Sequence, residues 1–570
     1  MAKNIIAYKK EFKKKFNYEG SRHMKKNLFI TALVIILVPF FFSCTPKGEK
    51  ESALRSGDYD DLVKLFKEWR EFQKPKMVDM VPDYTAEAMA KQYQELKKYQ
   101  ARLAAFDVHS WPISQQVDYH LVRAEMNGLD FDHRVLRPWS RNPAFYAVYY
   151  LSPSDVPALE GPWRYGTLCL WNYTFPLKGD QYDDFKKHLQ AIPLVLEQAK
   201  KNLTEPARDL WFLGIRRKKA ESAFLSHLAG RLQDDHPELV PEIQRAKEAV
   251  DEFCQWLAAR YAEMSAPSGV GKENYDWYMK NVHLCPYSWE EQLAIMNREL
   301  ARSLSSLKLE EERNRHLPPL QPVQSREEYQ KRRDEAVDYF MKFMRAKMMD
   351  LPDYMNDTLK RTVSFIPPGN LWDFFNQIDY HDPLPLLGHG THWFDLARMA
   401  HEPHPSPIRR VPLLYNIWDS RAEGLATGME EMAMHAGLLE ERPRARELTW
   451  ILLACRCVRG IGDLKMHSNE FTLEEAVDFA VQWTPRGWMP KEGRTIWTDE
   501  DIYLQQPGYG TSYVVGKVHL EKLLADYSRL KGEKFDLKEF FAAFNACGLI
   551  PLSLIRWEMT GLDDEIKLLF

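Results

Sequence analysis

Apolar residues recur at steps of three and four along most of the chain, and this spacing predicts amphipathic helices. The first such segment runs from Asp61 to about Phe106, and the second from Gln115 to Leu129. Strand-like alternation is scarce, and Leu168–Tyr173 and Arg361–Ile366 are the best short candidates. The other helical segments are Gln181–Lys201, Leu203–Leu232, Pro241–Met264, Trp289–Arg313, Ser325–Met348, Leu387–Met399, Ala422–Leu439, Pro443–Arg459, Leu473–Gln482, Ser512–Lys531, Leu537–Ala546 and Leu552–Gly561. The pattern therefore predicts a mainly α protein with few short strands and no clear linker.

The first 44 residues have the pattern of a secretory leader. Met24 begins a short basic stretch, and residues 28–42 are an uncharged apolar run of 15 residues that ends just before Cys44. A basic start, an apolar run and a small residue before a cysteine are typical of a bacterial lipoprotein signal. The run is also shorter than the ~20 residues of a membrane span. We expect residues 1–44 to be the leader, Met24 its true start, Cys44 the lipidated residue and residues 45–60 a tether. The alternative is an uncleaved N-terminal anchor.

Composition and charge narrow the classes of function. The 17 Trp, 26 Tyr and 29 Phe exclude a disordered chain. A mean hydropathy of −0.48 with a single long apolar run excludes a polytopic membrane protein. The leader holds nine basic and two acidic residues, so without it the net charge changes from −4 to −11. An acidic body gives no electrostatic footprint for nucleic acid. We expect a lipid-anchored protein of the cell envelope, on the periplasmic or outer-membrane face, with no nucleic-acid partner.

Metal-ligating residue types are concentrated between residues 381 and 395. His389 and His392 are three residues apart, so on a helix they share a face, and Asp395 extends that face by three more. Imidazole and carboxylate ligands suit Zn²⁺ or a similar divalent ion. The alternative is a pair of structural histidines near a helix N-terminus.

A second candidate feature is a pair of glutamates on one helical face. Glu423 and Glu430 are seven residues apart, which is two turns, and they flank the small residues Gly424 and Thr427. Small residues allow another helix to come close, and two carboxylates on such a face require a cation or a hydrogen-bond donor. The alternative is a solvated acidic face.

A polar row follows on a later helix. Arg456, Arg459, Asp463 and His467 lie on one helical face, where they could orient ligands or bind a substrate carboxylate. An intrahelical ladder of ion pairs is the alternative.

Two tyrosines lie at a glycine-rich entry into the next long helix. The segment from Pro507 contains Tyr509 and Tyr513, whose hydroxyl groups could donate to an oxyanion. An ordinary loop with packed aromatic side chains is the alternative.

Taken together, these features resemble the bacterial proteins grouped as domain-of-unknown-function family 885, which look related to the helical gluzincin-type metallopeptidases. The resemblance covers roughly residues 60–565. It implies one large multi-helix domain, 61–570, with a deep central cleft. The segments that carry it are Val270–Tyr278, the glutamate segment at 423, Arg456–His467, Pro507–Lys517, Phe535–Phe540 and Gly548–Leu552.

The family's metal motif is similar to HExxPGHxxQ, followed later by EGWALYAE. Counting back 34 residues from Glu423 places the first histidine on His389, and Glu423 and Glu430 match the two glutamates of the second motif. The glutamate after the first histidine falls on Gly390, and the Pro-Gly-His falls on residues 393–395. The histidine expected after the last Phe-Asp-Leu segment is Phe541. In the metallopeptidase mechanism the missing glutamate is the general base, a role that Gly390 lacks the side chain to fill.

The resemblance implies a Zn²⁺-dependent or other divalent-metal-dependent hydrolase of the peptidase or amidase type, acting on a peptide-like or other amide or ester substrate. A straight helix favours His392 as the third ligand, and a kinked one favours Asp395. The alternatives are lyase-like chemistry or ligand binding without turnover, because the usual catalytic glutamate is absent. The candidate residues are His389, His392, Asp395 and Glu423 for the metal; Glu430, Tyr509 and Tyr513 for catalysis; and Arg456, Arg459 and His467 for substrate binding.

Overall fold

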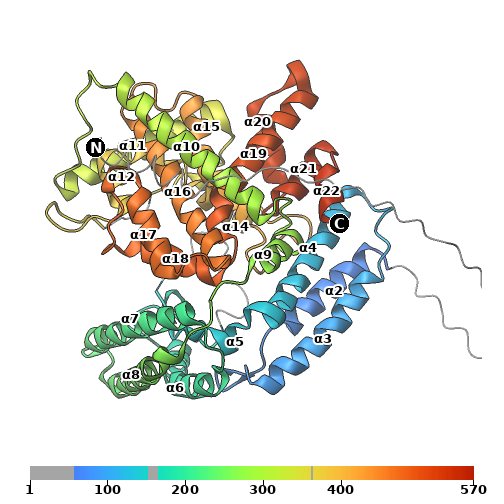
Figure 1. The fold of residues 1–570 in the computed structure, drawn as a ribbon, viewed down its shortest axis with the longest axis vertical. Helices are drawn as coiled ribbons and strands as arrows, with labels where there is room; N and C mark the ends of the chain where they lie inside the picture. The colour runs from blue at the N-terminus through green and yellow to red at the C-terminus, as the bar shows by residue number, and fades with distance from the viewer. Residues whose placement is uncertain (1–56, 152–164, 361–363) are drawn as a thin grey trace, which may run out of the picture. The chain divides into compact units, whose positions relative to one another are not determined.

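Helices make up nearly all regular structure in the computed structural model, which describes residues 57–151, 165–360 and 364–570 (Figure 1). The leader, Cys44 and most of the tether lie outside the described residues. The helices are α2 (Tyr59–Phe72), α3 (Ala86–Ala104), α4 (Ile113–Phe131), α5 (Pro138–Arg141), α6 (Asp180–Asn202), α7 (Arg208–Leu232), α8 (Val240–Arg260), α9 (Lys272–Asn281), α10 (Trp289–Arg313), α11 (Arg326–Phe343), α12 (Phe374–His381), α13 (Leu384–Leu387), α14 (Thr391–His401), α15 (Asp419–His435), α16 (Ala445–His467), α17 (Leu473–Trp483), α18 (Arg494–Gln505), α19 (Tyr509–Lys531), α20 (Leu537–Ala546), α21 (Leu552–Thr560) and α22 (Asp564–Leu569).

The strands are short and form two pairs. β1 (Met77–Val78) pairs antiparallel with β2 (Val81–Pro82), and β3 (Tyr149–Tyr150) pairs parallel with β4 (Leu168–Cys169). The described residues belong to one compact unit. The expectation of a mainly α, single-domain fold with few short strands is confirmed.

Local sequence signals account for many helix starts. Ser288 accepts a hydrogen bond from the backbone N–H of Glu291, whose side chain accepts one from the backbone N–H of Ser288. Thr472 and Glu475 form the same capping box at the start of α17. Such boxes satisfy backbone N–H groups that have no partner within the helix.

Helix α16 is the central helix of the C-terminal half, and all but two of its residues are buried. Helices α10, α17 and α19 pack against it. A helix that is apolar or buried all round lies in the interior of a domain, and small residues along α16 allow its neighbours to come close. A Cβ atom at Gly460 would lie 2.8 Å from the carbonyl oxygen of Gly510.

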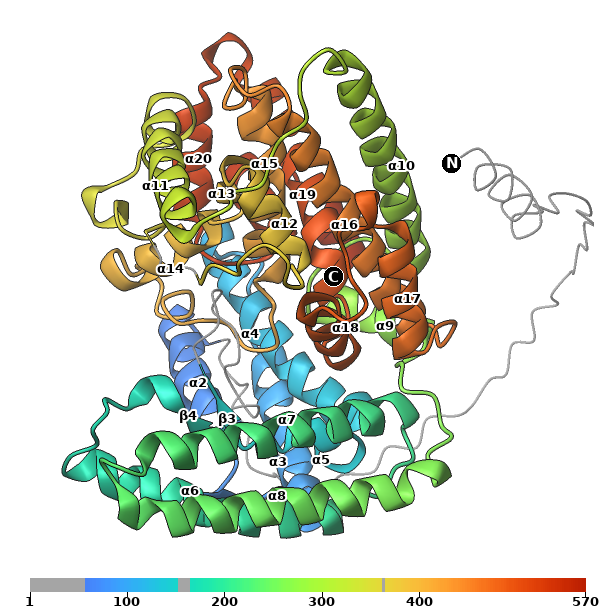
Figure 2. The same cartoon turned by 90° about the vertical axis from the view of Figure 1, so that its left-hand side faces the viewer.

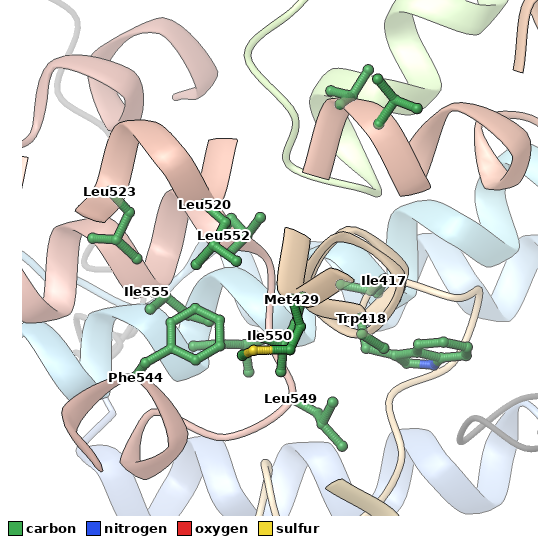
Figure 3. Close-up of a cluster of buried hydrophobic side chains, with 14 of the residues drawn as sticks. Ile417, Trp418, Met429, Leu520, Leu523, Phe544, Leu549, Ile550, Leu552 and Ile555 are labelled. Carbon is green, nitrogen blue, oxygen red and sulfur yellow. The ribbon is translucent and has the colours of Figure 1, made fainter. Parts of the chain in front are cut away.

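Helices α15 and α19 pack closely through glycine. A Cβ atom at Gly424 would lie 2.6 Å from Cα of Gly516 on α19. The structure therefore confirms the expectation that the small residues beside Glu423 admit another helix. Figure 3 shows Met429 of α15 in a buried hydrophobic cluster with Leu520 of α19, Phe544 of α20 and Leu552 of α21. This buried cluster fixes α15, the helix that carries both glutamates.

Helices α6, α7 and α8 form a separate layer with its own hydrophobic cluster. They lie side by side in both views (Figures 1 and 2). Within the described residues, no helix combines the length and apolar content that crossing a bilayer requires.

Several predicted boundaries are wrong. The helix predicted for Pro443–Arg459 runs from Ala445 to His467, because glycines at 460 and 462 serve packing instead of ending the helix. The helix predicted for Leu387–Met399 is interrupted, since α13 ends at Leu387 and α14 begins at Thr391. The strand predicted for Leu168–Tyr173 shrinks to β4, and residues 364–366 of the other candidate form no strand. The first three residues of that candidate lie outside the described residues.

Candidate metal centre

Three candidate ligands come together where the turn between α13 and α14 meets α15. His389 lies in that turn, His392 lies in the first turn of α14, and Glu423 lies in α15. Helices α13 and α14 both pack on α15. Gly388 makes the approach possible, because a Cβ atom there would lie 3.0 Å from the backbone nitrogen of Glu430.

The ligand atoms converge on one point. Nε2 of His389 lies 3.6 Å from Oε2 of Glu423, and Nδ1 of His392 lies 3.7 Å from the same oxygen. Ligand atoms of the three residues all lie within 4.8 Å of one another. The side chains of His392 and Glu423 are each 3% exposed and that of His389 is 17% exposed. The cluster is therefore nearly closed to solvent, with His389 on its more open side.

Glu423 is held so that one oxygen remains available. Its Oε1 accepts a hydrogen bond of 2.8 Å from the hydroxyl of Tyr509, while its buried Oε2 accepts none. A buried carboxylate oxygen without a hydrogen bond is costly unless something else compensates it. A cation bound between the three residues would do so.

Tyr509 is placed by the entry into α19. Gly508 has a positive φ of 86°, and the carboxylate of Asp463 accepts hydrogen bonds from the backbone N–H groups of Gly508 and Thr511. Burial raises the pKa of Asp463 to about 8, against the effect of these bonds. Asp463 thus holds the start of α19, the helix that carries Tyr509.

Glu430 and Arg456 lie on the other side of the His389 ring. Arg456 forms a bidentate ion pair with Glu430, with bonds of 2.9 and 2.6 Å, and its Nη2 lies 3.0 Å from Nδ1 of His389. Burial and the nearby guanidinium hold the pKa of His389 well below its usual value. Burial raises the pKa of Glu430 to about 7, and Arg456 opposes that shift.

Asp395 points away from the cluster into a different ion pair. Both of its oxygens accept bonds from Arg421, at 2.6 and 3.0 Å, and Arg398 lies 3.1 Å away. Of the two residues considered as third ligand, the structure places His392 beside Glu423 and Asp395 beside Arg421. The sequence analysis missed Arg421. Its spacing from Asp395 gives no signal, because the two residues lie on different helices that only the tertiary fold brings together.

The remaining members of the polar row contact other parts of the fold, although His467 Nε2 also lies 3.7 Å from Oδ1 of Asp463 in the same row. Arg459 pairs with Asp499 and lies 5.5 Å from the ring centre of Tyr513, which stacks on His389 at 6.0 Å. His467 is fully buried, and its Nε2 lies 3.0 Å from the carbonyl oxygen of Tyr503. Burial lowers the pKa of His467 to about 4, so this side chain is a neutral structural group. The row therefore shares one face of α16, but only Arg456 contacts a member of the cluster.

A cavity of about 460 Å³ lies elsewhere, between α7 and α18. Arg216, Arg494 and Trp497 are among its lining residues, and none of the candidate site residues is.

The fold and site together define a mainly helical protein with a buried His-His-Glu cluster. The family model described as "Bacterial protein of unknown function (DUF885)" matches residues 71–370 and 388–559. The chain belongs to this family.

Two solved structures share the fold. One is titled a "putative lipoprotein of unknown function" from Shewanella oneidensis, with 16% identity, a TM-score of 0.63, and coverage of 88% of this chain and 97% of that chain. The other is titled a "putative lipoprotein" from Colwellia psychrerythraea, with 15% identity, a TM-score of 0.63, and coverage of 88% and 98%. No curated protein is significantly similar to the chain.

Proposed function

We propose that this protein binds one divalent cation, Zn²⁺ by the chemistry of its ligands, through His389, His392 and Glu423. The observation that carries the proposal is the separation of the ligand atoms. A tetrahedral zinc ion with ligand bonds of 2.0–2.2 Å requires its ligand atoms to be about 3.4 Å apart. The two separations from Oε2 of Glu423 are 3.6 and 3.7 Å, and that oxygen is buried without a hydrogen bond.

The ligand set supports hydrolysis as the reaction class. Two histidines and one glutamate leave a fourth position open, as catalytic zinc sites do. When bound, the cation supplies Lewis-acid polarisation of a substrate carbonyl and of water. Around it, Tyr509 orients Glu423 through the 2.8 Å hydrogen bond, and Tyr513 packs on the His389 ring. The substrate class that we propose is a peptide-like amide or an ester.

The position of Glu430 gives it a role other than general base. Its carboxylate approaches Nδ1 of His389 at 3.5 Å, whereas the cation would be held on the Nε2 side. We therefore assign Glu430 to positioning the His389 ring. With Gly390 in place of the usual glutamate, no carboxylate of the proposed set serves as base, and losing a general base costs typically 10²–10⁴-fold in rate. We expect slow turnover.

The absence of a side chain at Gly390 and the pairing of Glu430 also favour a second candidate function, a binding protein without turnover. Gly390 has no side chain to activate water, and both oxygens of Glu430 are bonded to Arg456. In this case the cation would hold a carboxylate or carbonyl ligand in place without cleaving it.

We also propose that the protein is a lipoprotein anchored in the cell envelope. Cys44 follows an apolar run of the right length, and the two structural neighbours carry lipoprotein titles. Membrane fractionation and radiolabelled palmitate incorporation test this for the full chain beside Cys44→Ala. Label in the wild type alone supports the anchor, and equal label in both refutes it.

The deciding experiment is elemental analysis of protein lacking residues 1–44. Wild type is compared with Glu423→Ala and with Glu440→Ala, a control that removes an exposed glutamate after α15. We expect one equivalent of zinc in the wild type and the control, and none in Glu423→Ala. Metal in all three proteins would show that the cation binds somewhere other than at Glu423. The absence of metal from all three would refute the metal proposal. A screen of peptides, amides and esters with the loaded protein then separates the hydrolase from the binding protein.

A further inference from the structure

The ring of His389 is contacted on both nitrogens by groups with opposite hydrogen-bonding requirements. Nε2 faces Oε2 of Glu423 at 3.6 Å, whereas Nδ1 faces Nη2 of Arg456 at 3.0 Å and Oε1 of Glu430 at 3.5 Å. All three partners are buried. The hydrogen of a neutral imidazole therefore has two possible places, and the neighbours decide between them.

Arg456 favours the ring form that has its hydrogen on Nε2. A guanidinium group has only N–H donors and no acceptor, so the 3.0 Å contact requires the lone pair of Nδ1. The single hydrogen of the neutral ring must then be on Nε2, facing the carboxylate of Glu423. A cation at the proposed site needs the opposite arrangement, because it takes the lone pair of Nε2.

Glu430 favours the ring form that has its hydrogen on Nδ1. Its Oε1 is already within 3.5 Å of Nδ1 and can accept a hydrogen from that nitrogen. Metal-bound histidines commonly donate their other N–H to a carboxylate, which fixes the ring and its hydrogen. The short shift that closes this distance would replace the contact between Arg456 and Nδ1.

We propose that Arg456 and Glu430 are a pair of positioning residues that control cation binding through the hydrogen on His389. Arg456 stabilises the metal-free ring with its hydrogen on Nε2. Glu430 stabilises the metal-bound ring with its hydrogen on Nδ1. The inference rests on the proposed metal site and deepens it, since it makes the affinity of the site depend on two residues that are not ligands.

If Arg456 and Glu430 have these opposing roles, their substitutions should change zinc affinity in opposite directions, which a purely structural ion pair would not. Arg456→Met removes the donor that stabilises the ring with its hydrogen on Nε2, the form that opposes cation binding. Zinc affinity should therefore rise by about 10-fold or more. Glu430→Gln removes the carboxylate and leaves Arg456 on Nδ1, so affinity should fall by about 10–100-fold, the usual range for such partners. If the ion pair served only to hold α15 and α16 together, both substitutions would lower the affinity.

Zinc affinity is measured by competition with a chromophoric chelator, using protein lacking residues 1–44. Arg459→Met is the matched control, because it removes a guanidinium one turn further along α16 that pairs with Asp499 instead of contacting His389. An equal gain in affinity in Arg459→Met and Arg456→Met would show a general charge effect and overturn the inference. A change in the same direction in Arg456→Met and Glu430→Gln would also overturn it.

A second measurement needs no variant of the pair and no metal. The ¹⁵N shifts of the imidazole rings in the metal-free wild type report which nitrogen carries the hydrogen, and His389→Gln assigns the resonance. We expect the Nε2–H form, and an Nδ1–H ring would refute the role of Arg456 even if Arg456→Met fails to fold. If the wild type binds no zinc but Arg456→Met does, the proposed function fails and the inference stands. If neither binds zinc, both fail.

Discussion

Replacing Gly516 with alanine tests how tightly the fold fixes the helix that carries Glu423. A Cβ atom at Gly516 would lie 2.3 Å from the carbonyl oxygen of Ser420 and 2.8 Å from Cα of Gly424. Both are backbone atoms of α15, so no side-chain rotation relieves the overlap. Helices α15 and α19 must therefore separate by roughly 1 Å to restore ordinary van der Waals contact.

The expected cost follows from two opposing effects. Overpacking typically costs about 1–3 kcal/mol, occasionally more, and a clash of backbone against backbone lies at the upper end. Alanine has a higher helix propensity than glycine, which offsets about 1 kcal/mol. We expect a net loss of about 2 kcal/mol in the free energy of unfolding. Ser420 is one turn before Glu423, so zinc affinity should fall as well.

The assay is urea unfolding followed by circular dichroism, with Gly428→Ala as the matched control. Gly428 lies one turn after Gly424 on the same helix, but the nearest atom to its added Cβ is Cδ2 of Leu520 at 3.2 Å, the end of a flexible side chain. The control should be within about 1 kcal/mol of the wild type. If Gly516→Ala is as stable as Gly428→Ala, the close contact does not constrain α15 and our reasoning is refuted.

Two further predictions concern single interactions. Tyr509→Phe removes the hydrogen bond that orients Glu423, so zinc affinity in the chelator competition should fall by about 10–100-fold; an unchanged affinity would show that the hydroxyl does not hold the ligand. Glu565 pairs with His519 and Lys522 at 2.8 and 2.6 Å, which lowers its pKa from 4.5 to about 2. Because the folded-state pKa is depressed, this pairing stabilises the fold above pH 4.5, and roughly 3 kcal/mol is lost as the pH falls from 4.5 to 2. Urea midpoints of wild type and Glu565→Gln should therefore differ at pH 7, differ less near pH 3 and converge at about pH 2. A difference that is independent of pH would contradict the assignment.

Much of the secondary structure could be predicted because each helix carries its own signal. Three- and four-residue apolar spacing marks α10, and the capping boxes at Ser288 and Thr472 mark where helices begin. The helix boundaries that were predicted wrongly lie at glycines. Gly460 has the signature of a helix end in isolation, but in the fold it lies against Gly510, and the helix continues because the neighbouring helix needs that space.

The sequence by itself determined which residues could share a face. A separation of three residues keeps His389 near His392, although His389 lies in the turn before α14 and not on the helix. The small residues beside Glu423 indicate a closely packed helix, because small side chains let another backbone approach. The resemblance to family 885 added the pairing between His389 and Glu423.

Only the tertiary structure decided what each face meets. Asp395 is as well spaced as His392 in the sequence, yet its carboxylate pairs with Arg421, a residue that the fold brings beside it. Glu430 lies on the face predicted for it, yet its carboxylate is nearest the Nδ1 side of His389. Helical spacing fixes the direction of a side chain from its own axis, whereas the partner in that direction depends on how α14, α15 and α16 pack against one another.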